Sequence, residues 1–411
     1  MLSRCDLPTS TCASPVLQSI VLQSIVLQST VYGCGLTRSG VRNVTATHRS
    51  DLAPLLHPDP LVREVLETWT PRFLTSGIPI GELARTVERI QTWDDWAKEW
   101  LRTGELHDQR GDQLAADGHM DSATTAWLLA CSCYHVGYHV AIRDHDLHEH
   151  GLSKMLKIHD KALPHMRPAV TKFELGSGEA RIVGLLSTPS AGPAPVVLLL
   201  PGLDSTKETR HAARGAWVAR GFAVVSIDGP GQGEASRWST IRPDYNVAVS
   251  SVIDWIEQQD ALDHTRIAVL GISLGGFYAP LAAANDHRIS ATVGNCGPYD
   301  WAECWDLIPQ VTREAFIHYS GASSESEALE IAALMTLEGV AEKITTPLLI
   351  VHGERDPLVP WQHGKRTVDE ASGPAELVLV EGGNHGVNNL PFASFPVIRD
   401  WVCEQLGVRE T

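Results

Sequence analysis

Residues 266–280, "RIAVLGISLGGFYAP", place a serine between two glycines at the junction of two predicted elements. Arg266–Leu270 predicts a short buried strand, and the residues that follow Gly275 predict a helix. Gly271-Ile272-Ser273-Leu274-Gly275 therefore forms a tight strand-to-helix turn of the kind that presents a nucleophile. Side chains two positions before and after the serine would collide with such a turn, which accounts for both glycines. The hydroxyl then stands at a helix N-terminus, where the helix dipole favours developing negative charge.

Two further loops supply the partners that a serine nucleophile needs. Asp356 follows the predicted strand "PLLIVHG", and His385 follows the predicted strand "ELVLVEG". The chain order Ser, Asp, His is that of an α/β-hydrolase. We therefore expect Asp356 to orient the imidazole and His385 to take and return the proton of Ser273. The alternative is that Asp356 only caps a turn and that His385 is an ordinary loop histidine.

The oxyanion of the reaction needs backbone N–H donors. One donor is expected at Leu274, directly after the nucleophile. The other should come from the loop after the strand "PVVLLL", which reads Pro201-Gly202-Leu203. Since Pro201 has no N–H, the donor is Gly202 or Leu203, and Leu203 is favoured.

The wider pattern predicts an α/β fold with a mostly parallel sheet covered by helices. Short apolar runs alternate with helical stretches over residues 169–411, as in a parallel sheet buried on both faces. Residues 296–344 are too long for a simple crossover and predict a helical lid over the carboxyl edge of the sheet. Residues 51–168 predict a separate helical domain, and its five tryptophans either fill the helical core or face a ligand: Trp69, Trp93, Trp96, Trp100 and Trp127.

The first 50 residues differ from the rest. Residues 16–30, "VLQSIVLQSIVLQST", repeat every five positions, a period that matches neither a helix nor a strand. We interpret residues 1–50 as a disordered extension, or as residues upstream of the real start. A signal peptide is a weaker alternative, because Gln and Ser interrupt the apolar run.

Composition narrows the class of protein. The 411 residues are 43% hydrophobic and 20% charged, which is typical of a soluble globular protein, and the net charge is −16. This acidity argues against nucleic acid and anionic membranes as partners, and no apolar run reaches the length of a membrane span. The eight cysteines are scattered without C-x-x-C spacing, so reduced thiols and a cytoplasmic location are expected.

Three other groups of residues are candidates for a role. Histidines cluster within residues 135–150, and His135 and His139 are spaced to share a metal on a helix. No H-E-x-x-H pattern accompanies them, so a polar helical surface is favoured and no metal or other cofactor is expected. Asp228 and Glu234 flank "GPGQG", which lacks the ending of a phosphate loop. We therefore interpret Glu234 as an acidic residue that is either exposed or placed just behind the active site.

The third group lies in the predicted lid. Trp301, Glu303 and Trp305 occur in "YDWAECWDL", near the expected pocket. They either pack the lid and carry solvated charge, or they orient an aromatic or cationic substrate.

The loops "LPGLDSTKE" and "IDGPGQGE", together with "GISLGG", resemble one particular α/β-hydrolase family. This family includes dihydroxypseudooxynicotine hydrolase, the fungal yellowish-green polyketide-shortening hydrolases and the fermentation–respiration switch protein. The resemblance spans about residues 105–408. It departs at Pro201, where glycine is expected. It implies that Ser273, Asp356 and His385 form a triad, and that the helical domain covers the active site and helps to form a homodimer.

The resemblance also implies an unusual bond. Its members suggest hydrolysis of a C–C bond in an aryl ketone or a polyketide-like carbonyl compound, so a small-molecule substrate is expected. Ester or peptide hydrolysis would use the same groups and remains open. A regulatory binding protein that keeps the fold without catalysis is the alternative from another class, and the complete set of catalytic groups argues against it.

Overall fold

The computed structural model describes residues 57–189 and 192–409. The predicted extension over residues 1–50 lies outside these ranges. All described residues belong to one compact unit of the chain. Within it, no helix combines the length and the apolar character needed to cross a membrane.

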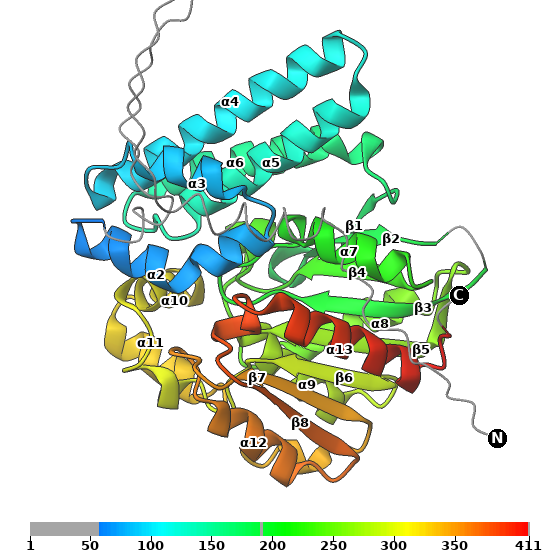
Figure 1. Ribbon diagram of the computed structural model, residues 1–411. Coiled ribbons are helices and arrows are strands. Elements are labelled where there is room, and N and C mark those ends of the chain that lie inside the picture. The colour runs from blue at the N-terminus through cyan, green and yellow to red at the C-terminus, as the bar shows by residue number, and fades with distance from the viewer. Residues whose placement is uncertain (1–56, 190–191, 410–411) are drawn as a thin grey trace, which may run out of the picture. The chain divides into compact units, whose positions relative to one another are not determined.

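The first part of the described chain is helical, as predicted. Its helices are α2 (Pro60–Thr75), α3 (Ile80–Val87), α4 (Trp96–Ala116), α5 (Met120–Tyr138) and α6 (His145–Ala162). Helix α2 begins at Asp59, whose carboxylate accepts hydrogen bonds from the first free N–H groups of the helix. Helices α4, α5 and α6 pack side by side along most of their length (Figure 1).

The tryptophans of this region take both of the roles considered. Trp96, Trp100 and Trp127 are buried in the helical core. Gly104 lies so close to α5 that an added Cβ would come within 2.5 Å of the Tyr134 ring, which allows α4 and α5 to approach closely. Trp69 is also buried, but it lines a cavity of about 450 Å³ at the edge of the helical region.

One eight-stranded sheet follows, in the order β1-β2-β4-β3-β5-β6-β7-β8. Strands β1 and β2 are antiparallel to their neighbours, and the pairs from β4 through β8 are parallel. The strands are β1 (Thr171–Leu175), β2 (Ile182–Ser187), β3 (Ala194–Leu200), β4 (Ala223–Asp228), β5 (Leu262–Ile272), β6 (Ala291–Asn295), β7 (Leu348–Gly353) and β8 (Ala375–Val380). The mostly parallel sheet agrees with the alternation of strand and helix patterns in the sequence.

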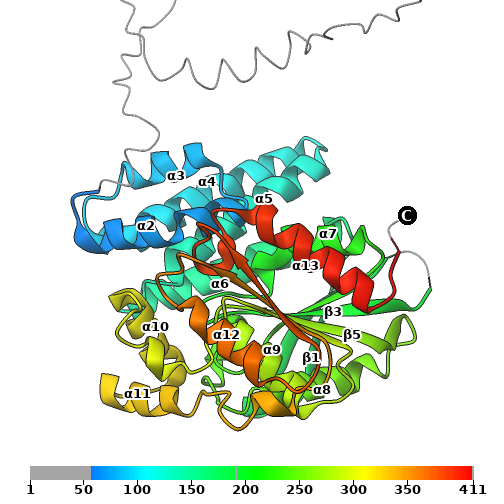
Figure 2. The same ribbon diagram turned by 60° about the horizontal axis from the view of Figure 1, so that its bottom comes forward.

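Helices bury both faces of the sheet, which explains why its central strands are continuously apolar. On β3, Val196 and Leu198 belong to one core, whereas Val197 and Leu199 belong to the other. The first core includes side chains of α8 (Asn246–Ile256) and α9 (Leu274–Asn285), and α12 (Trp361–Glu370) packs on the same face. The second core includes side chains of α7 (His211–Val218) and α13 (Pro391–Gln405). Figure 2 shows these two helices on the same side of the sheet.

The edge strand β8 departs from this pattern. Its side chains alternate between partly buried and exposed, and Leu379 is 41% exposed. A continuous apolar run therefore does not prove that both faces are buried, because an edge strand has fewer covering helices.

The segment between β6 and β7 contains two helices, α10 (Gln310–Ser320) and α11 (Glu325–Ala333). Asp300 and Thr336 form an isolated bridge that ties its two ends together. Helix α10 also contacts the helical region, because Arg143 forms an ion pair with Glu314 at 2.6 Å. The segment thus packs against the helical region beside the carboxyl edge of the sheet (Figure 1).

Candidate active site

Ser273 lies between β5 and α9 in a strained backbone conformation. Its φ is +59° and its ψ is −126°, which is rare for a residue with a Cβ. Two hydrogen bonds support this turn: Ser273 N donates to Asn295 O at 2.9 Å, and Gly276 N donates to Ser273 O at 2.7 Å. The strain is therefore built into the framework, as in a nucleophile elbow.

The flanking glycines are required by contacts as well as by the turn itself. A Cβ on Gly271 would lie 1.8 Å from Gly275 O. A Cβ on Gly275 would lie 2.6 Å from Leu200 O, at the end of the neighbouring strand β3. The first contact is within the turn, as the sequence predicts, but the second arises only from the sheet.

Asp356 and His385 are brought together from two separate loops. His385 Nδ1 donates to Asp356 Oδ2 at 2.8 Å. The other carboxylate oxygen accepts from the N–H groups of Leu358 at 2.9 Å and Val359 at 3.0 Å. Burial raises the pKa of Asp356, but His385 and these donors outweigh burial and hold it below its ordinary value. The ionised carboxylate fixes the ring so that Nε2 is left for another partner.

Ser273 and His385 line one cavity of about 450 Å³, together with Leu203. Leu274 is the first residue of α9, so its N–H has no acceptor within the helix. A Cβ on Gly202 would lie 3.2 Å from the Cβ of Ser273, which shows how closely the loop after β3 approaches the nucleophile. Gln232 holds this loop by donating to Pro201 O at 2.9 Å and Gly202 O at 3.0 Å.

Helices α2 and α5 also hold the loop after β3. Arg72 forms an ion pair with Asp204 at 2.7 Å and donates to Ser205 Oγ at 3.3 Å. His135 Nε2 donates to Asp204 O at 2.8 Å. Burial opposes ionisation of Asp204, but Arg72 lowers the pKa of its carboxyl to about 2. Sequence reasoning missed Arg72 and Asp204, because 132 residues separate them and no local pattern marks the pair.

Helix α2 reaches the histidine loop as well. Thr75 Oγ1 donates to Asn388 Oδ1 at 3.0 Å, and Asn388 Nδ2 donates to His385 O at 2.9 Å. The helical region therefore contacts both sides of the candidate site.

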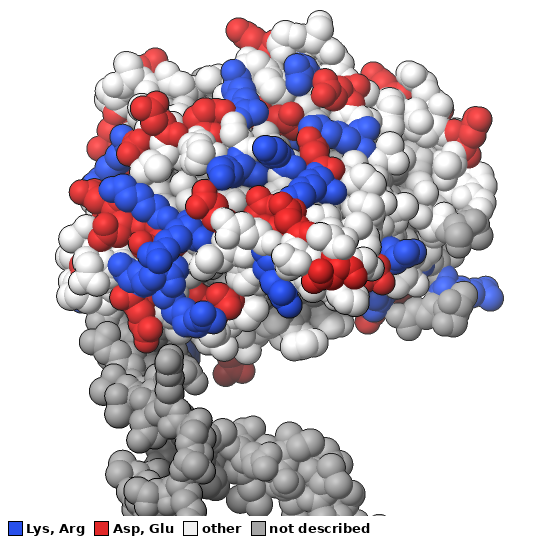
Figure 3. All heavy atoms as spheres, turned by 90° about the horizontal axis from the view of Figure 1, so that it is seen from above, with Lys and Arg blue, Asp and Glu red and all other residues white. Residues whose placement is uncertain are grey.

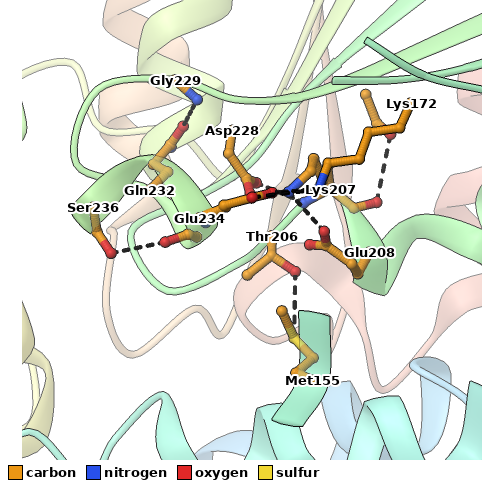
Figure 4. Close-up of polar contacts among 12 residues, drawn as sticks. Met155, Lys172, Thr206, Lys207, Glu208, Asp228, Gly229, Gln232, Glu234 and Ser236 are labelled. Carbon is orange, nitrogen blue, oxygen red and sulfur yellow. Dashed lines mark hydrogen bonds and ion pairs between the residues drawn. The ribbon is translucent and has the colours of Figure 1, made fainter. Parts of the chain in front are cut away.

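A buried cluster of charges supports the same loop from behind (Figure 4). Lys207 Nζ lies 2.8 Å from Asp228, 2.6 Å from Glu208 and 3.0 Å from Glu234, and the Lys207 side chain is fully buried. Burial alone would lower the pKa of Lys207, but the three carboxylates raise it, so the ammonium is charged at neutral pH. In the sequence, Asp228 and Glu234 flank a glycine-rich turn. Through Lys207, these two acids join β4 and the loop that follows it to the loop after β3. Glu234 is 9% exposed and lies behind the site, not on the surface.

The three predicted substrate-binding residues do not lie together. Trp301 is buried and lines the cavity. Glu303 lies outside the cavity, where it is exposed, forms an ion pair with Arg366 at 3.4 Å and lies 3.9 Å from His363 Nε2. Trp305 is buried in the lid, and its Nε1 donates to Glu325 at 3.2 Å. Glu303 therefore cannot orient a cationic substrate in this cavity.

The expectation of a polar histidine surface is wrong for three residues. His135, His139 and His148 are buried, whereas His145 and His150 are exposed. Tertiary packing buries the first three. His135 and His139, at the end of α5, lie against the loop at Asp204, and the ring of His148 on α6 packs against aromatic rings of Tyr138, His318 and Tyr319.

The rings of His135 and His139 stack with centroids 4.7 Å apart instead of converging on a common point. His139 Nδ1 donates to His135 O at 2.9 Å, so each ring already bonds to the backbone. Burial is the main cause that lowers the pKa of both imidazoles and keeps them neutral. The pair thus supports the loop at Asp204.

One group in the described chain has the spacing of metal ligands. It consists of Cys296, Asp356 and His385, whose ligand atoms lie within 4.8 Å of one another. Burial raises the pKa of the Cys296 thiol well above its usual value, and a protonated thiol is a poor ligand. His385 Nδ1 already donates to Asp356. These groups fit a hydrogen-bonded arrangement better than a metal centre.

Comparisons with known proteins agree with this geometry. The chain is 29% identical over 342 residues to 2,6-dihydropseudooxynicotine hydrolase of Paenarthrobacter nicotinovorans, covering 82% of this chain and 91% of the relative. It is 33% identical over 245 residues to 20-hydroxy-prefusarin hydrolase of Gibberella moniliformis, but covers only 58% of that protein. The crystal structure of 2,6-dihydroxy-pseudo-oxynicotine hydrolase matches with a TM-score of 0.74 at 28% identity, over 82% of this chain and 95% of the other. The AbyA5 structure shares the fold, with a TM-score of 0.66 at 20% identity.

These similarities confirm an α/β-hydrolase fold with a preceding helical region, and they identify the protein as an enzyme of the hydrolase class. The resemblance inferred from the loops after β3 and β4 is also confirmed. The family model described as "Esterase FrsA-like" matches residues 82–381, which is well over half of the chain, and the protein therefore belongs to the FrsA-like family of α/β-hydrolases.

Proposed function

We propose that this protein is a serine hydrolase in which Ser273 is the nucleophile, His385 the general base and acid, and Asp356 the group that orients His385. The observation that carries the proposal is the 2.8 Å bond between His385 Nδ1 and Asp356, with His385 and the strained Ser273 lining one cavity. Because Nδ1–H faces Asp356, Nε2 is the nitrogen that can accept the serine proton. The imidazolium that forms is stabilised by the buried carboxylate.

The oxyanion would be held by the backbone N–H groups of Leu203 and Leu274. Leu274 directly follows Ser273 in the chain, and Leu203 lines the same cavity as Ser273. Gln232 holds the loop that contains Leu203 at Pro201 and Gly202, and His135 holds it at Asp204. Donors fixed in this way stabilise a tetrahedral intermediate without further reorganisation.

The bond that we propose is a C–C bond of an activated ketone. Ser273 Oγ adds to the carbonyl carbon while His385 takes the serine proton. Collapse of the tetrahedral alkoxide breaks the bond to the adjacent carbon, which leaves as a carbanion and receives the proton from His385. Water, activated by His385, then hydrolyses the acyl-enzyme to release a carboxylic acid and regenerate Ser273.

The shape of the cavity supports a substrate with an aromatic or polyketide-like body. Its apolar walls include Trp69, Trp217, Trp301 and Phe395. The indole nitrogen of Trp301 is buried, and none of the described residues accepts its proton. The similarity to hydrolases named for pseudooxynicotine and prefusarin compounds supports the same class.

Ester hydrolysis is the second candidate, and the name of the matching family model favours it. An ester needs the same nucleophile, base and oxyanion donors, but its alkoxide leaves more easily than a carbanion. A peptide bond is the related third possibility.

We also propose a homodimer in the cytoplasm. The five cysteines in the described ranges are buried and form no disulfide, which supports a reducing compartment. The proposal of a dimer through the helical region rests on the family resemblance. Equilibrium sedimentation of the purified protein tests it, and a monomer at micromolar concentration would contradict it.

An experiment in heavy water tests the bond. The purified enzyme is offered a panel of β-diketones and hydroxyaryl ketones beside p-nitrophenyl esters, with Ser273→Ala as the control. C–C cleavage places solvent deuterium on the departing carbon, which mass spectrometry detects. Ester turnover with no deuterated fragment from any ketone would leave only the esterase. Full activity of folded Ser273→Ala would contradict the serine mechanism itself.

A further inference from the structure

The charged side chains that line the catalytic cavity are mostly basic. Arg72, Arg210 and Arg399 are cationic, and Asp204 is anionic. Arg72 and Asp204 neutralise each other through their 2.7 Å ion pair. Arg210 and Arg399 therefore add uncompensated positive charge to this cavity, although the chain as a whole has a net charge of −16.

Arg210 has no partner among the described residues. It ends the short helix η5 (Glu208–Arg210), directly after the loop that approaches Ser273. Its Nε is buried without an acceptor, and no carboxylate in the described ranges lies within ion-pair distance. Burial and the nearby charge of Arg72 lower its pKa to about 10, so the guanidinium is still charged at neutral pH. The side chain as a whole is only partly buried, so the rest of the guanidinium can meet a ligand in the cavity, and a cation without a protein partner there favours an anionic ligand.

Arg399 adds a second cation from helix α13. It lies over the ring of Phe395, with 5.9 Å between the guanidinium carbon and the ring centroid. Throughout the parts of the chain that the structure describes, it makes no ion pair. Many other arginines and lysines are paired, as Lys154 is with Glu105 at 3.0 Å. On the face shown in Figure 3, basic and acidic side chains are interspersed.

We propose that the substrate carries a carboxylate remote from the reacting carbonyl, and that Arg210 holds this carboxylate with Arg399 contributing charge. This inference rests on the proposed function, because it takes the cavity beside Ser273 as the reaction site. A planar guanidinium matches a carboxylate with two parallel hydrogen bonds. The acid best placed to attract a cation, Asp204, is already bound by Arg72, and Glu303 lies outside. The cavity therefore selects an anionic carbonyl compound over a cationic one.

Binding to the inactive Ser273→Ala protein tests the inference without turnover. The ligands are 4-oxo-4-phenylbutanoate, its neutral methyl ester, and an aryl ketone with an ammonium group in place of the carboxylate, each titrated by calorimetry. A hydrogen bond to a charged group is worth about 1.5–3 kcal/mol, so the carboxylate should bind about 10- to 100-fold tighter than the ester. Adding Arg210→Met should abolish this preference, Arg210→Lys should keep part of it, and the exposed, ion-paired control Arg242→Met should leave it unchanged.

Each outcome decides the inference. Equal affinity for the carboxylate and its ester, tighter binding of the ammonium compound, or a preference that survives Arg210→Met would overturn it. A different result refutes the proposed function: the wild-type protein turns over no ketone or ester, and a fluorophosphonate does not label Ser273. A carboxylate preference in binding with no turnover would thus keep the anion site and reject the hydrolase mechanism.

Discussion

Replacing Lys207 by Met should destabilise the protein strongly. The substitution keeps most of the side-chain volume but removes the cation that three carboxylates share at 2.6 to 3.0 Å. Breaking a buried ion pair by removing one partner costs about 3–5 kcal/mol, because the remaining charges stay buried. Since Lys207 is fully buried, we expect a loss of about 4 kcal/mol in the free energy of unfolding at pH 8.

The loss should become smaller at low pH. Burial and the charge of Glu208 already raise the pKa of Asp228 to about 6, and removal of Lys207 raises it further. A carboxyl whose folded pKa is raised stabilises the protein below its unfolded pKa, and this stability is lost as pH rises through the folded pKa. The difference between Lys207→Met and wild type should therefore shrink between pH 8 and pH 5.

Urea unfolding, followed by tryptophan fluorescence and circular dichroism, measures this difference. Lys365→Met is the control, because Lys365 is exposed and pairs with Asp369 on the same helix, so its loss should cost less than about 1 kcal/mol. Adding Asp228→Asn to Lys207→Met should recover part of the lost stability. This double variant can be measured in place of the single variant if the single variant is insoluble. A single variant within 1 kcal/mol of wild type at pH 8, or one that is more strongly destabilised at pH 5, would refute the reasoning.

Four other outcomes are expected. Ser273→Ala should abolish hydrolysis in a steady-state assay while the urea midpoint remains that of wild type. Asp356→Asn should lower kcat by about 10⁴-fold, because the imidazole loses its orienting charge, and a decrease below tenfold would contradict that role. Gly271→Ala should prevent folding or cost more than about 3 kcal/mol, since its Cβ would lie 1.8 Å from a backbone oxygen, whereas Gly81→Ala, with open space around it, should fold normally. Incubation with EDTA should leave the rate unchanged, and an activity that zinc restores after chelation would show that a metal had been missed.

The elements that could be predicted from the sequence are those whose residue requirements involve positions close together in the chain. The elbow at Ser273 could be predicted because a tight strand-to-helix turn restricts the residues two positions away. Asp356 and His385 could be assigned because each follows a predicted parallel strand, and the carboxyl ends of parallel strands meet at one edge of a sheet. The helical region and the mostly parallel sheet follow from apolar spacings of three to four residues and from continuous apolar runs.

Contacts between segments that are far apart in the chain could not be predicted from the sequence. The expected surface histidines His135 and His139 are buried because the end of α5 packs against the loop at Asp204, and periodicity does not say which distant segment covers a helix. Glu303 follows Trp301 by two positions, yet Trp301 lines the cavity and Glu303 is exposed, because the short helix at residues 302–304 turns the two side chains in different directions.

The sequence alone therefore determined the tight turn at Ser273 and the places of Asp356 and His385 after two parallel strands, because strand ends and tight turns are local features with strict residue requirements. The tertiary structure alone decided how these residues are supported and which charges line the cavity beside them. Arg72 binds Asp204 across 132 residues, and Arg210 faces a cavity whose walls come from the helical region, the lid and helix α13. Burial and pairing of charges depend on all segments that pack around them, so they appear only once the chain is folded.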